Sequence, residues 1–398
     1  DHDRLRHDPL LAVLVGKRDP QGEQRTRSRD RGKALAGKST LNRLELTPVR
    51  ARATSRYKKI VANLGAIQAF FVEAFVQQQQ SPPTRLVLDL DSTDNPLHGD
   101  QLGRFFHGYY DAYCYLPLYI FCGDHPLLAL LRPSNIDDSV GVLKHLGRII
   151  ACLREVWPHV EILVRGDSGF CREHLMRWCE ENSVDDVFGL PKNARLLREV
   201  EGELAEAERQ VRQSGQAARL FKDFRYRTLE SWSQERRVVA KVEYLRLGPN
   251  PRFVVTSLPP EQYAAQAVYE VEYCGRGEME NRIKEQQRML FACRSSCATM
   301  RANQLRLAFS TVAYILMRAL REFGLAETEL ATAQSDTIRV KLLKVGALVR
   351  VTVRRVWVSL SESYPFREVW VRVWEKLRNL VVPLGGSGPA VAAGYGPG

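Results

Sequence analysis

Arg85-Leu-Val-Leu-Asp-Leu-Asp91 alternates as a β-strand does, with its three leucines on one face and Val87, Asp89 and Asp91 on the other. The polar pair Ser92-Thr93 follows and predicts a turn, so Asp91 is expected at the end of the strand. Open α/β sheets bind ligands in the crevice at such strand ends. The stretch therefore predicts a sheet strand that offers Asp91, with Asp89 on the same face.

The flanking sequence predicts a mixed α/β layer. A helix is expected over 57–79, ending before Ser81-Pro82-Pro83, which marks a domain boundary. After the first strand we expect a strand within 109–121, a helix over 138–156, a strand over 160–164, a helix over 172–182 and a strand over 187–190. This β, β, α, β, α, β order is typical of a mixed sheet flanked by helices.

The pattern then changes twice. Three strand-like stretches, 224–229, 238–247 and 252–257, predict a compact β insertion, and helices return over 277–323. Residues 339–360 alternate basic and apolar side chains and favour a strand. The tail after Pro383 is of low complexity, and we expect it to be disordered.

Composition and cysteine spacing exclude several classes of protein. The 398 residues are 44% hydrophobic and 26% charged, which excludes collagen, coiled coil and wholesale disorder. No run of about 18 apolar residues is present, so no spanning helix is expected. The eight cysteines are scattered and include no C-x-x-C pair, which predicts free thiols in a reducing compartment and no structural zinc site.

The charge is concentrated near the two ends of the chain. Residues 1–60 hold 16 Lys/Arg against 7 Asp/Glu, and residues 339–378 hold 10 against 3, so these segments carry +9 and +7 of a total of +12. The stretch between them is slightly acidic. This distribution fits a protein that grips a polyanion and acts on it with carboxylates, although charge runs also occur on ordinary solvated surfaces.

One motif is misleading. Gly32-Lys-Ala-Leu-Ala-Gly-Lys-Ser39 matches the phosphate-binding pattern G-x-x-x-x-G-K-[ST]. A P-loop requires a buried strand immediately before the first glycine, and the preceding residues, 24–31, are Gln-Arg-Thr-Arg-Ser-Arg-Asp-Arg. We therefore expect no P-loop here.

A second carboxylate follows another predicted strand end. Asp167 lies in Val164-Arg-Gly-Asp-Ser-Gly169, directly after the strand over 160–164. Two carboxylates at neighbouring strand ends can share a hard divalent cation such as Mg²⁺, whose remaining ligands are water and substrate phosphates. The alternative is that each aspartate only closes a turn, and for either one alone that alternative is favoured.

The third element is Tyr273-Cys-Gly-Arg-Gly-Glu-Met-Glu280 and the helix-forming residues after it. In one continuous helix, a single face would carry Tyr273, Arg276, Glu280, Lys284 and Gln287. This stripe is not a core face. It is either a solvated surface or the wall of an active site that offers a metal ligand and phosphate contacts.

Together, the segments Leu88–Thr93, Arg165–Phe170 and Tyr273–Glu280, in this order and with a β insertion before the third, resemble the DDE transposases of bacterial insertion sequences. The likeness is strongest to the group 1 transposase DDE domain whose third motif reads Tyr-x2-Arg-x3-Glu-x6-Lys. It extends over roughly residues 1–380. One position departs from the pattern, because Gln287 stands where the motif has a lysine. The contact that this lysine makes with phosphate is then lost or taken over by Lys284.

The resemblance implies an RNase H-like catalytic domain, interrupted by the β-rich insertion and preceded by a helical, basic N-terminal region. Asp91, Asp167 and Glu280 are then the catalytic triad and the ligands of two Mg²⁺ ions, which Mn²⁺ can replace. Tyr273, Arg276 and Lys284 are then DNA contacts. Three further candidates are weaker: Asp89, Arg282 and Gln287.

The resemblance also implies a division of the chain and a set of partners. Its parts are a basic DNA-binding region at 1–80, which we expect to lack an N-terminal piece, two parts of the catalytic core at 81–218 and 259–330, the insertion at 219–258, a basic segment at 331–382 and the tail at 383–398. The expected partner is double-stranded DNA, as terminal inverted repeats and target, held by a homodimer in a synaptic complex. A cytoplasmic, nucleoid-associated location in a bacterium follows.

Other functions remain open on the sequence alone. A catalytically impaired relic would only bind DNA, and Gln287 favours that reading. An RNase H-like nuclease would cut without strand transfer. A serine recombinase using Ser92 or Ser168 is disfavoured, because neither serine has an arginine-rich setting of its own.

Overall fold

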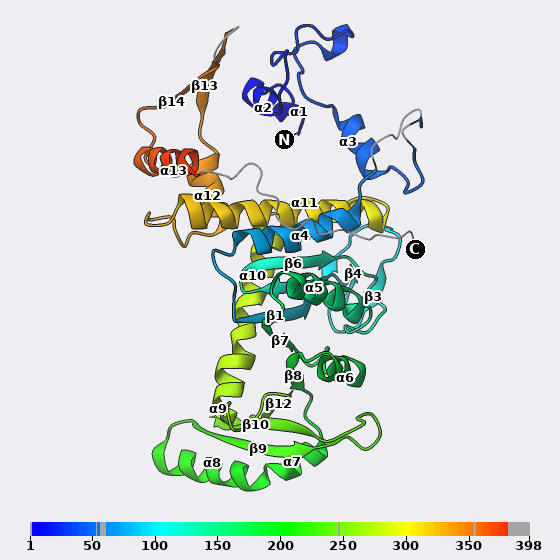
Figure 1. The fold of residues 1–398 in the computed structure, drawn as a ribbon, viewed down its shortest axis with the longest axis vertical. Helices are drawn as coiled ribbons and strands as arrows, with labels where there is room; N and C mark the ends of the chain where they lie inside the picture. Colours follow the sequence, from blue (N-terminus) through cyan, green and yellow to red (C-terminus); the bar gives the residue numbers. More distant parts are fainter. Residues whose placement is uncertain (1, 53, 56–60, 246, 353–355, 381–398) are drawn as a thin grey trace. The chain divides into compact units, whose positions relative to one another are not determined.

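The computed structural model describes residues 2–52, 54–55, 61–245, 247–352 and 356–380 (Figure 1). Within them the chain forms two compact units. The first contains the stretch up to Leu64, Met289–Phe291 and the chain from Cys297 onward. The second contains Gly65–Arg288 and Ala292–Ser296.

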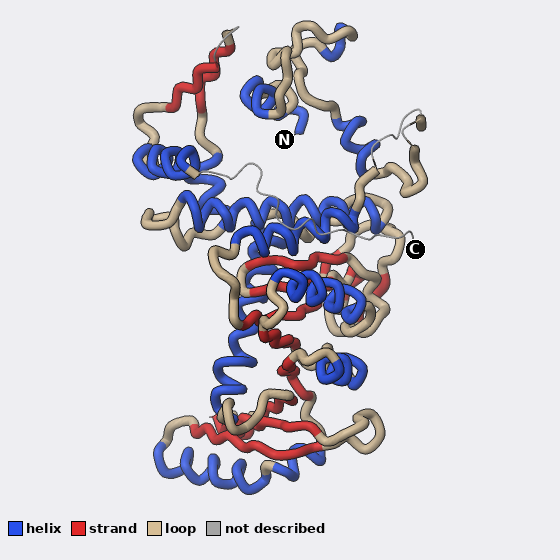
Figure 2. Tube along the Cα trace, viewed as in Figure 1, coloured by secondary structure: helices blue, strands red, loops and turns tan. Residues whose placement is uncertain are grey.

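The second unit is built on a mixed sheet (Figure 2), with strand order β11-β10-β12-β8-β7-β1-β5-β6 and β9 paired to β10. Only β1, β7 and β8 run parallel to one another. The strands are β1 (Arg85–Ser92), β5 (Leu118–Cys122), β6 (His125–Leu130), β7 (Glu161–Gly166), β8 (Asp185–Leu190), β9 (Ala218–Tyr226), β10 (Arg236–Leu245), β11 (Gly248–Pro249) and β12 (Arg252–Thr256). The observed architecture is a mixed α/β fold, as expected from the sequence.

The predicted strand within 109–121 is two strands. It is divided at Leu116-Pro117 into β4 (Ala112–Tyr115) and β5, because proline lacks the N–H that a continuous ladder needs. β4 belongs to a separate three-stranded sheet with β2 (Asn95–Pro96) and β3 (Phe105–His107). The sequence reasoning did not anticipate β6, which pairs with β5.

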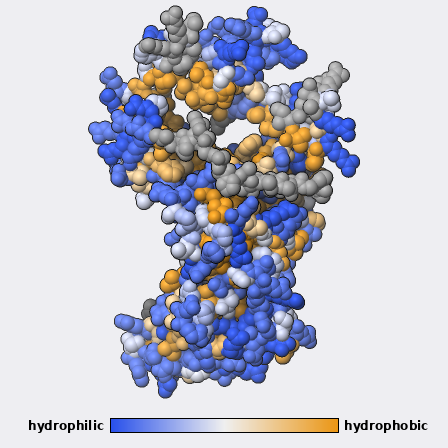
Figure 3. All heavy atoms as spheres, in the orientation of Figure 1, coloured by the Kyte–Doolittle hydropathy of each residue, from blue (hydrophilic) through white to orange (hydrophobic). Residues whose placement is uncertain are grey.

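Helices cover the sheet, and their apolar faces form the main core. In α5 (Val142–Val156) the buried residues recur at helical spacing, namely Val142, Leu146, Ile149, Ile150 and Leu153. The other helices of this group are α4 (Leu64–Gln78), α6 (Glu173–Glu181), α7 (Ala194–Glu199) and α8 (Glu201–Ser214). Helix α4 begins later than predicted, and residues 57–60 of that prediction lie outside the described residues. Figure 3 shows a largely hydrophilic surface over α8.

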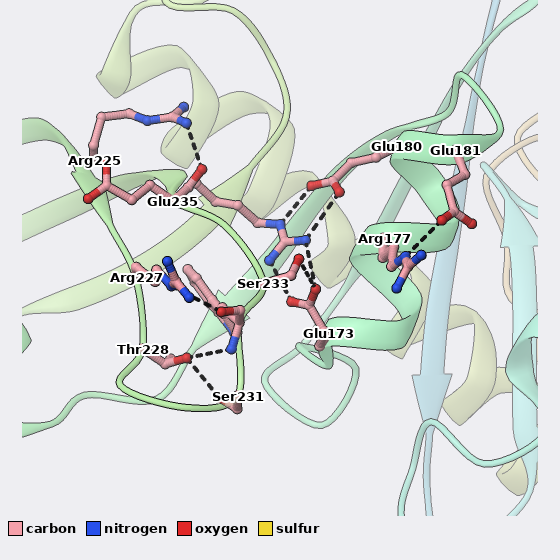
Figure 4. Close-up of polar contacts among 12 residues, drawn as sticks. Glu173, Arg177, Glu180, Glu181, Arg225, Arg227, Thr228, Ser231, Ser233 and Glu235 are labelled. Atoms are coloured by element: carbon pink, nitrogen blue, oxygen red, sulfur yellow. Dashed lines mark hydrogen bonds and ion pairs between the residues drawn. The ribbon is translucent and has the colours of Figure 1, made fainter.

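The strands of the 219–258 region continue the main sheet. β12 pairs with β8, and β10 pairs with β12. Figure 4 shows Glu173 and Glu180 of α6 pointing toward one guanidinium, that of the buried Arg236 on β10; Nη1 lies 2.6 Å from Glu173 and Nε 2.7 Å from Glu180. These ion pairs join the strands of this region to α6.

The third motif does not lie on one α-helix. The chain passes from α9 (Ala265–Ala267) through a π-helical turn, η2 (Val268–Tyr273), and a 3-10 turn, η3 (Cys274–Arg276), before α10 (Gly277–Met289) begins. Gly275 and Gly277 weaken helix formation here. Val268 and Tyr269 pack on the β7–β8 face of the sheet with Leu163 and Val187. The expected single helical stripe is therefore wrong for Tyr273, which is carried by the π-helical turn.

The first unit combines helices with a hairpin. Its elements are α1 (His2–Leu5), α2 (Pro9–Leu14), η1 (Ser28–Asp30), α3 (Lys38–Glu45), α11 (Met300–Ala319), η4 (Leu320–Gly324), α12 (Ser335–Ile338), η5 (Arg339–Leu343), β13 (Ala347–Val351), β14 (Val356–Leu360) and α13 (Arg367–Asn379). The predicted strand over 339–360 is thus a helical turn followed by two paired strands.

The P-loop-like motif has no P-loop structure. Gly37 precedes the short helix α3, and no strand lies among residues 16–36 of the described chain. The predicted tail at 383–398 lies outside the described residues. Within them, every helix is too short or too polar to cross a bilayer.

Candidate active site

Asp91 lies near the carboxyl end of β1, paired with Tyr119 of β5 on one side. It is 9% exposed. Burial raises the pKa of Asp91 to about 7; the Arg276 guanidinium opposes this rise, and the charges of Asp167 and Glu280 add to it. The carboxyl group that the sequence singled out first is thus buried and lies in the electrostatic field of the other two candidates.

Asp167 directly follows β7, the parallel neighbour of β1. Asp89 pairs with Arg165 in the β1–β7 register, and each candidate carboxylate comes two residues later on its strand. Since side chains two apart share a face, Asp91 and Asp167 emerge on the same side of adjacent strand ends. Asp167 Oδ1 accepts a hydrogen bond of 2.9 Å from the Gly169 N–H, which closes the turn.

Glu280 lies in the first turn of α10, and Arg276 connects it to Asp91. The Arg276 guanidinium places Nη1 3.4 Å from Asp91 Oδ1 and Nη2 3.3 Å from Glu280 Oε1. Its side chain is 13% exposed. Burial by itself lowers the pKa of Arg276, and the carboxylates of Asp91 and Asp167 outweigh that effect, so the pKa is raised. The guanidinium thus occupies the space between two carboxylates of the candidate triad.

Asp89 has a different environment from Asp91. Both of its oxygens bind Arg165 of β7, Oδ1 at 2.6 Å from Nε and Oδ2 at 2.7 Å from Nη2. Arg165 also donates from Nη1 to the Glu272 carbonyl oxygen at 2.5 Å. Asp89 therefore supports, through Arg165, the turn that carries Tyr273 and Arg276.

Tyr273 lines a cleft of about 490 Å³ beside the Asp167 turn. A side chain at Gly189 would meet the Tyr273 hydroxyl at 2.6 Å, so the absence of a Cβ there allows the ring to approach β8. The cleft also presents two cations and a second phenol ring that sequence reasoning missed: Lys192, Arg252 and Tyr269. Tyr269 lies four positions before Tyr273, a helical spacing that could have indicated it, and the two ring centroids are 5.6 Å apart. Lys192 and Arg252 have no spacing that connects them to the third motif.

The remaining candidates on α10, Lys284, Gln287 and Arg282, differ in exposure and in their contacts. Lys284 is exposed, with Nζ 3.9 Å from Glu280 Oε2. Gln287 donates from Nε2 to the Asp94 carbonyl oxygen at 3.0 Å, which ties α10 to the end of β1. Arg282 is half-buried and lies two positions after Glu280, so the two side chains do not share a helix face.

Asp138 and Arg132 were also missed. The buried Arg132 donates to the carbonyl oxygens of Leu116, Asp138 and Val140 and to Ser92 Oγ, joining the end of β1 to the loop before α5. Asp138 Oδ2 lies against the Asp167 turn, 2.5 Å from where a Cβ on Gly169 would be. Burial, with the nearby Asp167, raises the pKa of Asp138. Asp138 is the first residue of the helix predicted over 138–156, whereas α5 begins at Val142 and Asp138 lies in the turn before it.

The donor chemistry of the triad fits a hard cation, but the arrangement is not a preformed metal site. Carboxylate oxygens are the ligands that Mg²⁺ prefers. Within the part of the chain that the structure describes, no three His, Cys, Asp or Glu side chains are grouped to hold a metal ion. Arg276 lies where the carboxylates of Asp91 and Glu280 would have to come together.

Comparison with known proteins decides the family. The family described as Transposase DDE domain group 1 matches residues 1–382. The chain belongs to this family of DDE-type transposases. No curated protein matches the transposase. A solved structure described as the piggyBac transposase synaptic complex with hairpin DNA is similar at 11% identity and a TM-score of 0.31, covering 60% of this chain. The transposase spans 49% of that chain.

Proposed function

We propose that this transposase cleaves DNA at transposon ends and transfers the freed 3′ end to target DNA, with Asp91, Asp167 and Glu280 as its catalytic carboxylates. The observation that carries the proposal is geometric: Asp91 and Asp167 lie at the ends of adjacent parallel strands, and the Arg276 guanidinium lies 3.4 Å from Asp91 Oδ1 and 3.3 Å from Glu280 Oε1. Perturbed carboxyl groups at strand ends are typical of active sites. The family supplies the reaction class, DNA strand transfer.

We further propose an RNase H-like core. The strand order β6-β5-β1-β7-β8 supports it, with β1 antiparallel to β5 and parallel to β7. In this core, Asp91 and Asp167 lie on adjacent strands, and α10 brings Glu280 alongside. The strands of the 219–258 region then extend this core as the β-rich insertion.

Two Mg²⁺ or Mn²⁺ ions held by the triad would activate the attacking oxygen and neutralise the leaving oxygen at the phosphate. The Arg276 guanidinium first has to leave Asp91 and Glu280. A guanidinium released from a carboxylate binds a phosphate well, since it can donate two parallel hydrogen bonds. We therefore propose that Arg276 moves onto the backbone phosphate of the bound strand.

Tyr273 and the cleft beside it would hold the strand being cut. Two phenol rings and the cations Lys192 and Arg252 line this space, which suits a base stacked on a ring with its phosphate paired to a cation. The exposed Lys284 is placed to replace the phosphate contact that Gln287 does not provide. Basic residues in 1–60 and 339–378 would supply most of the salt-sensitive affinity for duplex DNA. A homodimer that holds two transposon ends is part of the same proposal.

The test uses labelled duplexes that cover the genomic sequence on either side of the gene, with Mg²⁺ or Mn²⁺. We expect metal-dependent cuts at discrete positions that Glu280→Gln abolishes. The matched control is Glu278→Gln, at an exposed position in the same helix turn, which should cut normally. Binding without cleavage by any of these proteins would instead establish the alternative, a catalytically impaired relic that only binds DNA. Cuts without any joined product would favour a nuclease without strand transfer.

A further inference from the structure

The three-stranded sheet beside the active site is unusually rich in aromatic residues. Residues 95–115, which form β2, β3 and β4 and their connections, are here called the aromatic lobe. They contain six aromatic side chains in 21 residues, against 9% over the whole chain: Phe105, Phe106, Tyr109, Tyr110, Tyr113 and Tyr115. The concentration is local, so it requires a local explanation.

Most of these rings face solvent. Tyr109, in the β3–β4 connection, is 86% exposed, Phe106 is 54% exposed and Tyr113 is 49% exposed. The Phe106 and Tyr113 rings pack edge to face, with centroids 5.7 Å apart. Single exposed apolar residues are ordinary, whereas a contiguous group of large exposed rings marks an interaction surface.

The lobe is fixed to the catalytic elements at several points. Tyr110 donates from its hydroxyl to the Ser92 carbonyl oxygen, one residue after Asp91, at 3.4 Å. The ring centroids of Tyr109 and Tyr110 are 5.0 Å apart. The exposed Tyr109 ring thus contacts Tyr110, which in turn is hydrogen-bonded to β1. On the other side, Gln287 of α10 binds the Asp94 carbonyl oxygen just before the lobe. A strand lying in the active site would therefore continue next to these rings.

The charges of the lobe distinguish among ligands. It carries two carboxylates, Asp100 and Asp111, and one guanidinium, Arg104. Arg104 pairs with Asp100 and lies over the Tyr113 ring, 4.7 Å from its centroid. The lobe is thus slightly acidic and gives phosphates little attraction. What it offers DNA is ring faces, on which unpaired bases of any sequence stack.

We propose that the aromatic lobe binds unpaired bases of the DNA strand next to the cleaved phosphate, with Tyr109 and Phe106 as the stacking residues. The proposal rests on the proposed function, because it takes the strand position from the Asp91 site. Its ligand is single-stranded DNA at the open junction, distinct from the duplex that the basic segments hold. Stacking involves no ion release, so this contribution to affinity is independent of salt.

The test measures binding of two fluorescent DNA probes to the full chain. One is a blunt duplex, and the other is the same duplex with an unpaired thymidine tail of about six nucleotides, within the range of about 4–16 that single-strand sites cover. We expect the Tyr109→Ala, Phe106→Ala double variant to lose at least about fivefold in affinity for the tailed probe and little for the blunt one. The salt dependence of binding should stay the same.

Two controls make the result specific. Leu102 is 68% exposed in the same lobe and has no ring, so Leu102→Ala should leave both affinities unchanged. Tyr109→Trp should preserve tailed-probe binding. Equal losses on both probes, a loss with Leu102→Ala, or a change of oligomeric state in the double variant would overturn the proposal; the last outcome would mark the face as a contact between copies. The exposed Glu278→Gln should bind the tailed probe normally. DNA cleavage by Glu280→Gln is measured in a separate assay, so a failure of the catalytic assignment is distinguished from a failure of the lobe.

Discussion

Arg165 binds both carboxylate oxygens of Asp89 across the β1–β7 pair, at 2.6 and 2.7 Å, and holds the Glu272 carbonyl oxygen with its remaining Nη. Arg165 thus joins β1 to the turn that bears Tyr273 and Arg276. The close two-point pairing of Asp89 with a guanidinium gives this carboxylate a structural partner within the fold. This supports the proposal that Asp91, rather than Asp89, is the catalytic residue.

The first prediction concerns this ion pair. The Asp89 side chain is 4% exposed and that of Arg165 is 11% exposed, so Asp89→Asn leaves a buried guanidinium without its charge partner. We expect a loss of roughly 3–5 kcal/mol in the free energy of unfolding, measured in denaturant. Asp100→Asn, which breaks the exposed ion pair to Arg104, should cost about 1 kcal/mol or less. Similar losses in the two variants would contradict the structural role of Asp89.

The second prediction concerns the pH dependence of stability. The pKa of Asp91 rises from 3.8 to about 7 on folding, so between these values the folded chain binds more protons than the unfolded chain. Stability should therefore fall as pH rises from about 4 to about 7, by an amount on the order of a few kcal/mol, and then level off. Asp91→Asn should make this fall smaller, with the remainder due to the buried Asp186, whose pKa burial raises to about 8, and the variant should abolish DNA cleavage. The exposed Asp111→Asn should preserve the slope, and an unchanged slope in Asp91→Asn would refute the assignment.

The third prediction concerns the approach of Tyr273 to β8. An added methyl group at Gly189 would meet the Tyr273 hydroxyl at 2.6 Å and the Ser168 nitrogen at 3.0 Å. Gly189→Ala should therefore lower the free energy of unfolding by roughly 1–3 kcal/mol. Tyr273→Phe removes the hydroxyl and should recover part of that loss, a coupling that a double-mutant cycle measures. If the changes in the free energy of unfolding are strictly additive, residue 189 and the Tyr273 hydroxyl are not in steric contact.

The fourth prediction concerns the missing lysine. Gln287→Lys keeps a donor near the Asp94 carbonyl oxygen and adds a charge, so we expect the salt dependence of duplex binding to steepen by about 0.9. Gln287→Met, of similar length but without a donor, should lower the free energy of unfolding by about 1 kcal/mol and leave the slope unchanged. If the lysine variant has the slope of the parent chain, no phosphate reaches this position.

Several elements follow from local pattern alone. β1 spans Arg85–Ser92, one residue past the predicted alternation, and α6 spans Glu173–Glu181 inside the predicted 172–182. Their periodicities are strong, and each lies between clear turn residues. The prediction of a single strand within 109–121 was wrong, because Pro117 cannot donate a hydrogen bond to a continuous ladder. The stripe through Tyr273 depended on one continuous helix, and the chain instead passes through a π-helical turn and a 3-10 turn before α10 begins.

Three features can be read from the residues without a structure: the order of the three carboxylate motifs, the concentration of charge near the two ends and the family that these features resemble. These are properties of residue type and spacing, which need no folded chain. The folded chain was needed to show that Arg165 pairs with Asp89, that Arg276 lies between Asp91 and Glu280, and that Lys192 and Arg252 line the cleft beside Tyr273. Each of these contacts joins segments that are far apart in the chain or depends on the direction of a side chain. The contacts form when adjacent strands pair and when α10 packs beside them.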